Sequence, residues 1–398
     1  MARRKISKKT QKEVVKAAKK YPVITLVIVI LLIISLVGCC VLHYKRVITI
    51  PFLEGVIPQE ELAGSGNGNG NGNGGTGGGD VITDDLQIHF LFLGNKSPGD
   101  CTLIKTGNTE ILIDAGSTES SAETLVPYIQ QYCTDGVLEY VIATHADTDH
   151  IAAFVGTTTA DGIFESFVCE TIIDFPITEK TTDTYYSYVE LRDAEIQAGA
   201  THYTALECWN NQNGAQRSYT LAEDITMNFL YQKYYEEDAS KENNYSVCML
   251  LSQGNNHYLF TGDLEADGEE SLLESNPDLP QCKLYKAGHH GSNTSSTKDL
   301  MDKIQPQIVV ANCCCGGKYN FPHQEFIDNV ASHTDKIYIP VAIADNGDGY
   351  ELLNGNIVVS SNGGDVTVNC SNNNTIFKDT QWFADNRTWP LNGVTSSE

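Results

Sequence analysis

The segment that most constrains this 398-residue chain is the seven-residue run THADTDH at 144–150. It directly follows the apolar run 137–143 (VLEYVIA), which predicts a buried strand. The run contains four potential metal ligands, His145, Asp147, Asp149 and His150. Imidazole and carboxylate groups at this spacing suit two divalent cations side by side, with His145 and Asp147 reaching one cation from an extended loop and Asp149 and His150 serving the second. The alternative is a polar loop with chance histidines.

Two later clusters add ligands of the same types. A pair of predicted strands, 246–252 and 257–260, leads to Asp263, a carboxylate that follows a small glycine and can bridge two cations. A short strand then precedes the sequence AGHHGS, which places His289 and His290 on a glycine-flanked loop. Three loops at three strand ends therefore predict a site for two divalent metal ions, and mixed His/Asp ligation suits Mn²⁺ as well as Zn²⁺.

The elements around these clusters predict a layered α/β or α+β fold with its site on loops at strand ends. Helical periodicity predicts helices at 121–132 and 186–198, and the acidic, aromatic segment 231–244 is expected to be a loop over the site. His202 is an uncertain further ligand, because a lone histidine is more often structural. Alternating or apolar runs bounded by turn residues predict strands at 88–93, 101–105, 110–113, 167–173 and 225–230.

The first 46 residues differ in charge from the rest of the chain. They hold 11 Lys/Arg and 1 Asp/Glu of the totals of 26 and 51, so the remainder carries 15 basic and 50 acidic residues, a formal net charge of −35. The run 22–42 has no charged residue across 21 positions, which is long enough to cross a hydrocarbon core of ~30 Å as a helix. A basic flank before an apolar span predicts a single-pass cell-membrane protein whose C-terminal body is extracellular.

The domain boundaries follow from these changes of composition. We expect a basic cytoplasmic tail at 1–21, a transmembrane signal anchor at 22–43 and a Gly/Asn-rich linker at 44–80, followed by a hydrolase domain at 81–345 and a β-rich C-terminal extension at 346–398. The glycine tract within the linker predicts a flexible tether. Two alternatives to the anchor are a cleaved signal peptide and a lipoprotein modified at Cys39, which ends the sequence LVGC.

Four motifs, in this order, resemble the metallo-β-lactamase superfamily and, within it, the hydrolase domain of ComEC-type competence proteins. They are GDCTLI at 99–104 with ILIDAG at 111–116, HADTDH at 145–150, LFTGDL at 259–264 and HHGSNTS at 289–295. The resemblance implies a four-layer αββα sandwich over about 86–345 with a dinuclear site at one edge. Asp147 departs from the pattern, because most of the superfamily has histidine there. The chain also has one apolar span where ComEC proteins have a multi-helix channel.

The resemblance also implies a role for each residue. His145 and Asp147 would bind one cation, whereas Asp149, His150 and His289 would bind the other, with Asp263 bridging the two. Asp114 would orient the ligand loop from behind, and His290 would face the substrate and stabilise a developing negative charge. The residues expected to act in catalysis are Asp149, Asp263 and His290.

Together these observations predict an outward-facing metal-dependent hydrolase, most simply a phosphodiesterase acting through a cation-activated hydroxide on a nucleic acid, a nucleotide or a wall polymer. The acidic body argues against tight nucleic-acid binding, unless Lys286, Lys298, Lys303 and Lys318 form a local basic patch. The alternatives are hydrolysis of a lactam, lactone or thioester, and a non-catalytic surface binding module. Protein partners are not indicated.

Overall fold

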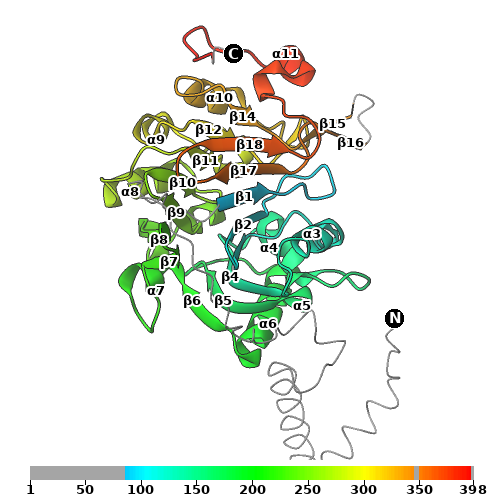
Figure 1. Cartoon of the computed structure of the whole chain (residues 1–398), viewed down its shortest axis with the longest axis vertical. Coiled ribbons are helices and arrows are strands. Elements are labelled where there is room, and N and C mark those ends of the chain that lie inside the picture. Colours follow the sequence, from blue (N-terminus) through cyan, green and yellow to red (C-terminus); the bar gives the residue numbers. More distant parts are fainter. Residues whose placement is uncertain (1–85, 345–348, 396–398) are drawn as a thin grey trace, which may run out of the picture. The chain divides into compact units, whose positions relative to one another are not determined.

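Two mixed β-sheets, each covered by helices on its outer face, form the centre of the computed structural model (Figure 1). The structure describes residues 86–344 and 349–395, all within a unit that spans Asp80–Glu398. The predicted tail, anchor and linker, 1–80, lie outside the described residues. Among the residues that are described, no helix is long and apolar enough to cross a membrane.

The first sheet has eight strands, and its middle strands lead directly to the predicted ligand loops. Its strand order is β18 (Val366–Cys370), β17 (Ile357–Ser361), β1 (Leu86–Phe90), β2 (Thr102–Thr106), β3 (Thr109–Ile113), β4 (Val137–Ile142), β5 (Val168–Asp174) and β6 (Thr201–Thr204). β1, β2 and β3 are antiparallel, whereas β3 to β6 run parallel. The parallel arrangement brings the carboxyl ends of β3 and β4 to one edge of the sheet.

The second sheet has seven strands, in the order β14 (Ile337–Tyr338), β12 (Ile308–Val310), β11 (Leu284–Lys286), β10 (Asn256–Phe260), β9 (Cys248–Gln253), β8 (Ile225–Leu230) and β7 (Ser218–Ala222). β10, β11 and β12 are parallel, so the loops that follow β10 and β11 also meet at one edge. A small third sheet contains β13 (Cys314–Cys315), β15 (Val341–Ile343) and β16 (Tyr350–Leu352).

Burial on both faces of the central strands explains the four layers. Tyr258 and Phe260 of β10 belong to the core between the sheets, whereas Leu259 packs with the helices outside the second sheet. Successive side chains of a strand point to opposite faces, so a central strand of apolar residues serves two cores. The outer layers are α3 (Ala122–Ile129), α4 (Thr148–Val155), α5 (Ile163–Ser166) and α6 (Asp183–Ala198) on the first sheet, and α8 (Ala266–Ser275), α9 (Lys298–Ile304) and α10 (Gln324–Val330) on the second.

The mixed α/β sandwich predicted from the sequence is therefore confirmed. The C-terminal region contributes to it directly, because β17 pairs with β1 along its whole length and β18 pairs with β17. Two strands from the predicted extension, 346–398, thus extend the first sheet. Two further short helices are α7 (Ala205–Asn210) and α11 (Gln381–Asn386).

Candidate metal centre

The segment that follows β4 turns into a helix sooner than the sequence indicated. Asp147, which was expected on an extended loop with His145, has extended backbone as the N-cap of α4, whereas Asp149 and His150 lie in the first turn of a helix that the sequence analysis did not predict. The backbone of neighbouring strands holds this turn: the Asp100 N–H donates to the Asp149 carbonyl at 3.1 Å, and the Ala115 N–H donates to the His150 carbonyl at 2.7 Å. The ligands are thereby fixed by main-chain contacts.

A glycine permits this close approach. A Cβ at Gly116 would lie 1.7 Å from the Asp149 carbonyl oxygen, far inside van der Waals contact. The ILIDAG sequence after β3 therefore lets the backbone pack directly against the start of α4. Asp114, two residues earlier, lies beneath the same turn.

Four buried side chains from four segments converge at the edge where both sheets end. Ligand atoms of Asp100, His150, Asp263 and His290 all lie within 4.8 Å of one another. Asp263 Oδ2 lies 3.2 Å from His150 Nε2 and 3.0 Å from His290 Nε2, and Asp149 Oδ2 lies 3.5 Å from His290 Nε2. Asp263 is thus in the middle of the group, the location required of a residue that bridges two cations.

His145 and Asp147 lie beside this group. The rings of His145 and His150 have centroids 4.1 Å apart, and His145 Nε2 lies 3.6 Å from Asp147 Oδ2. Asp147 also pairs with Lys180. Burial alone would raise the pKa of Asp147, but hydrogen bonding by His145 and Lys180 outweighs burial and lowers it. The carboxylate is therefore ionised and available to a cation.

The hydrogen bonds of the buried histidines leave one nitrogen of each ring free. Nδ1 of His150 lies 2.8 Å from Asp114 Oδ2, Nδ1 of His290 lies 3.0 Å from the Asn312 carbonyl, and Nδ1 of His145 lies 3.1 Å from Thr144 Oγ1. All three Nε2 atoms are buried, and none makes an aligned hydrogen bond among the described residues, although Asp263 Oδ2 lies within 3.2 Å of those of His150 and His290. A buried ring nitrogen is seldom left without a partner. When the N–H at one position of the imidazole donates a hydrogen bond, the lone pair of the other nitrogen can bind a metal ion.

The local electrostatic potential also favours the binding of cations. Burial lowers the pKa of His150 and of His290, but the Asp263 carboxylate outweighs burial and raises the pKa of both imidazoles well above the ordinary value. The same negative potential that retains a proton on these rings would attract a divalent cation, which competes for the same Nε2 lone pairs. Both the donor atoms and the potential therefore suit metal ions.

Two members of the site, Asp100 and Lys286, have no predicted role. Lys286 is 3% exposed, and its Nζ lies 2.5 Å from Asp100 Oδ2, 3.4 Å from Asp263 Oδ1 and 2.9 Å from the Gly262 carbonyl. Lys286 therefore cannot contribute to the basic surface patch that the sequence analysis considered as a condition for nucleic-acid binding. Asp100 follows Gly99 in the GDCTLI motif, and Lys286 directly precedes AGHH, so both lie in motifs that the sequence singled out.

The two adjacent histidines occupy different environments. His290 is 1% exposed and lies within the buried group, whereas the His289 side chain is 24% exposed, with Nε2 4.0 Å from Asp263 Oδ2. Both residues have positive φ, 46° for His289 and 57° for His290, a backbone conformation that costs of order 1–3 kcal/mol and is concentrated at functional sites. The geometry thus distinguishes the two rings, although the metal and substrate roles assigned to them stay predictions.

A cavity of about 450 Å³ opens onto this group. Its walls include both adjacent histidines, the aspartates at the start of α4 and a group of aromatic residues. Among the lining residues are Asp147, Asp149, Asn243, Asp263, His289, His290 and Tyr319. Asn243 belongs to the 231–244 segment, so that segment reaches the site wall as the sequence predicted.

His202 does not join the ligand group. It lies on β6, where Nε2 is 2.9 Å from Asp174 Oδ1 at the end of β5. Asp174 also pairs with Arg192 at 2.8 Å. This contact gives His202 a structural partner outside the group of four convergent ligands.

Comparison with known proteins supports the superfamily that the sequence motifs resemble. Residues 94–157 match the family model described as Metallo-beta-lactamase superfamily. This region contains the GDCTLI, ILIDAG and HADTDH motifs. The predicted resemblance to the metallo-β-lactamase superfamily is therefore confirmed.

The narrower resemblance, to competence proteins, is also confirmed. The chain is 27% identical over 100 residues to ComE operon protein 3 of Bacillus subtilis, covering 25% of this chain and 13% of that protein. It is 26% identical over 237 residues to Recombination protein 2 of Haemophilus influenzae, covering 58% and 25%. It is 24% identical over 243 residues to Competence protein ComA of Neisseria gonorrhoeae, covering 60% and 29%. The chain thus spans under a third of the length of each of these relatives.

Proposed function

We propose that this protein is a metal-dependent phosphodiesterase with two divalent cations, Zn²⁺ or Mn²⁺, held outside the cell by the apolar segment 22–43. The observation that carries the metal-dependent part is the set of three buried Nε2 atoms, of His145, His150 and His290, none of which makes an aligned hydrogen bond among the described residues; those of His150 and His290 lie 3.2 and 3.0 Å from Asp263 Oδ2. The phosphodiester part is supported by the relatives, one of which is named for recombination and one for competence.

The ligand set that the geometry favours differs in one residue from the set implied by resemblance. His145 and Asp147 would hold one cation, and Asp149, His150 and His290 the other, with Asp263 shared. His290 replaces His289 because it is the buried ring with a free Nε2. When bound, the cations lower the pKa of a water molecule and polarise the bond to be cleaved.

The chain's own residues then position the ligands and the substrate. Asp114 accepts hydrogen bonds from the Thr144 N–H and hydroxyl, both at 2.7 Å, and from His150 Nδ1, so one carboxylate fixes the start of the ligand segment. The Lys286 ammonium group contacts both Asp100 and Asp263, and its positive charge offsets the repulsion between the two carboxylates. The site is therefore rigid before substrate enters.

His289 would act on the substrate. Burial lowers the pKa of His289, so its ring is neutral near pH 7. Thr294 Oγ1 lies 3.0 Å from Nδ1, and the Asn243 amide nitrogen lies 3.4 Å from the same atom. With Nδ1 accepting from these groups, Nε2 carries the proton and can donate to a phosphate oxygen or to the leaving group.

The test uses the full-length chain in detergent, with metal content measured per chain and bis(p-nitrophenyl) phosphate as substrate in Mn²⁺ or Zn²⁺. We expect about two metals and turnover that falls at least about 100-fold in Asp263→Asn, the scale of losing a catalytic electrostatic contact. The control is Asp302→Asn, the same chemical change on the exposed face of α9. Metal without diester turnover would favour the lactam, lactone or thioester alternative, and no bound metal would refute the site.

A further inference from the structure

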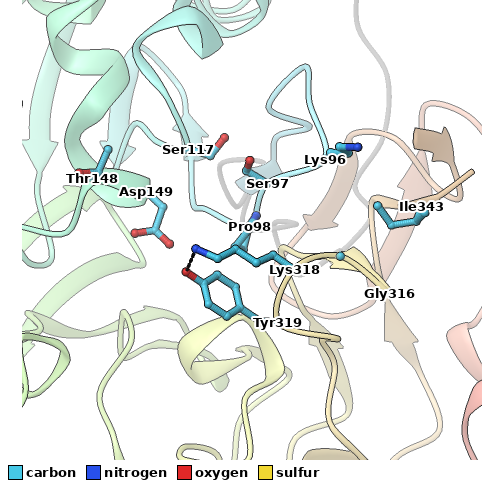
Figure 2. Close-up of a pocket in the computed structure, with 11 residues that line it drawn as sticks. Lys96, Ser97, Pro98, Ser117, Thr148, Asp149, Gly316, Lys318, Tyr319 and Ile343 are labelled. Atoms are coloured by element: carbon cyan, nitrogen blue, oxygen red, sulfur yellow. Dashed lines mark hydrogen bonds between the residues drawn. The ribbon is translucent and has the colours of Figure 1, made fainter. Parts of the chain in front are cut away.

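A second cavity, of about 730 Å³, adjoins the metal centre (Figure 2). It shares four lining residues with the site cavity, Pro98, Thr148, Asp149 and Tyr319. Most of its remaining wall comes from two loops, one before β2 and one after β13, which contribute Lys96 and Lys318, and Ser117 and Ile343 complete it. The metal centre therefore opens into a larger groove with basic side chains on it.

We propose that this groove is a subsite for a second phosphate group, so that the substrate is a phosphodiester chain in which another phosphate lies next to the bond that is cleaved. This inference rests on the proposed function. It specifies a substrate with at least two phosphates and assigns two residues outside the metal ligands, Lys96 and Lys318, to substrate specificity.

The charges of this groove are the first support. The chain beyond residue 46 has 15 basic and 50 acidic residues, whereas the wall of this groove has two lysines and a single carboxylate, Asp149. Neither Lys96 nor Lys318 forms an ion pair with any other residue in the described ranges 86–344 and 349–395; the Lys318 amine instead lies 3.0 Å from the Tyr319 hydroxyl. Two unneutralised ammonium groups beside a cation site favour an anionic ligand.

The positions of these side chains are the second support. Figure 2 shows the Lys318 amine and the Tyr319 hydroxyl pointing toward Asp149, with Lys96 on the side of the groove away from it. The groove therefore has a donor pair close to the reacting centre and a further cation beyond. This order suits an extended chain with phosphates at successive positions better than a single compact diester.

The loops that carry the lysines are held in place, so the groove exists before a ligand binds. Asn95 Oδ1 accepts from the Ser97 N–H at 2.8 Å and from the Ser117 hydroxyl at 2.9 Å. In the opposite loop, the Gly317 N–H donates to the Cys314 carbonyl at 3.1 Å and the Asn320 N–H donates to the Gly317 carbonyl at 2.8 Å. Prior ordering of both loops reduces the entropy lost on binding.

Tyr319 adds a contact of another kind. It is 49% exposed and lines both cavities. The Lys318 ammonium lies 4.8 Å from the centroid of this ring, so the groove offers an exposed aromatic surface beside a cation. Such a combination binds nucleic-acid strands, because a base stacks on an aromatic ring while phosphates pair with the cations. We therefore infer that the phosphodiester chain is an oligonucleotide strand.

The experiment compares two chromogenic substrates that differ by one phosphate. They are the p-nitrophenyl esters of thymidine monophosphate, with and without a second phosphate on the free hydroxyl of the sugar, each in its 3′ and 5′ isomers and each assayed with the full-length protein and Mn²⁺. In the wild type, we expect the second phosphate to raise kcat/KM at least about tenfold for one isomer, the effect of a hydrogen bond to a charged group.

Substitution then assigns the gain to the groove. In Lys318→Ala and in Lys96→Ala the ratio of kcat/KM between the two substrates is expected to fall toward one, mostly through KM, and Lys318→Arg is expected to restore it. Lys336→Ala, at an exposed lysine directly before β14, is the control and should retain the wild-type ratio. The salt dependence of KM for the longer substrate should also weaken in the Lys318→Ala variant.

The outcomes separate this inference from the proposed function. If no thymidine ester is hydrolysed in the presence of bound metal, the proposed function fails. If the esters are hydrolysed but the second phosphate gives no gain, or both lysine variants keep the wild-type ratio, the subsite is refuted while the phosphodiesterase stands. A glycerol-phosphate oligomer that outcompetes a thymidine oligonucleotide of equal charge would refute the choice of a nucleic-acid strand.

Discussion

Lys286 offers the sharpest test of how the site is balanced. It is a buried ammonium group between two buried carboxylates. Burial alone would lower the pKa of Lys286, yet the charges of Asp100 and Asp263 outweigh burial and raise it. The change Lys286→Met keeps most of the side-chain volume and removes the charge. We expect it to destabilise the metal-free protein strongly.

The magnitude follows from the distances. At an effective dielectric constant of about 20, unit charges 2.5 Å apart, as for Lys286 Nζ and Asp100 Oδ2, attract by about 7 kcal/mol. Desolvation of the ammonium group offsets part of this attraction, and removing one partner of a buried pair costs about 3–5 kcal/mol in total. We therefore expect the free energy of unfolding to fall by about 3–5 kcal/mol in EDTA.

Divalent cations should reduce this loss, because they neutralise the carboxylates that Lys286 leaves unpaired. The assay is urea unfolding of the full-length chain in detergent, followed by tryptophan fluorescence, in EDTA and in saturating Mn²⁺. Lys336→Met, at an exposed lysine directly before β14, is the matched control and should cost less than about 0.5 kcal/mol. A loss below about 1 kcal/mol in EDTA, or an equal loss with and without metal, would refute the view that Lys286 balances the carboxylates.

Two further predictions follow from the site and its surroundings. His290→Asn should lower the bound metal from about two ions per chain toward one, whereas His289→Asn should keep both ions and lower kcat about 10²–10⁴-fold, as for loss of a proton donor; equal metal loss in both variants would contradict the roles proposed here. Burial raises the pKa of Glu269 to about 7 from 4.5, so the folded state holds the proton more tightly and the resulting stability is complete below pH 4.5 and lost as pH rises through 7. The stability lost amounts to about 3 kcal/mol. In unfolding experiments between pH 4.5 and 8, the free energy of unfolding of the wild type should fall by that much relative to that of Glu269→Gln. A difference between the two proteins that does not change with pH would contradict this prediction.

Strands were predictable where local pattern and burial agree. The run 225–230 is β8 with the same bounds, because its apolar and polar residues alternate and turn residues flank it. The helix α4 was missed although its signals are present: Asp147 is a favoured N-cap residue, and Gly156 ends the helix. The polar ligands in its first turn obscured the apolar face that follows.

Contacts between distant segments could not be predicted in the same way. Asp100 comes 50 residues before His150 in the sequence, and only the pairing of β2 with β3 and of β3 with β4 brings them together. Lys286 looked like a surface residue because an isolated lysine is almost always exposed, and its burial depends on carboxylates from two other strands. Which of His289 and His290 turns inward is set by their left-handed backbone, which the HHG sequence does not specify.

The site's own charge explains how so acidic a protein could act on the anionic substrate proposed above. Five carboxylates, Asp100, Asp114, Asp147, Asp149 and Asp263, lie in or directly behind the ligand group, and among the described residues Lys180 and Lys286 form ion pairs with three of them. Once metal binding has made the histidines neutral, these groups sum to a negative charge, which would repel an anionic diester. One divalent cation leaves a negative balance, whereas two reverse its sign. Substrate attraction thus depends on the second cation, and the net charge of the chain is a poor guide to what this site can bind.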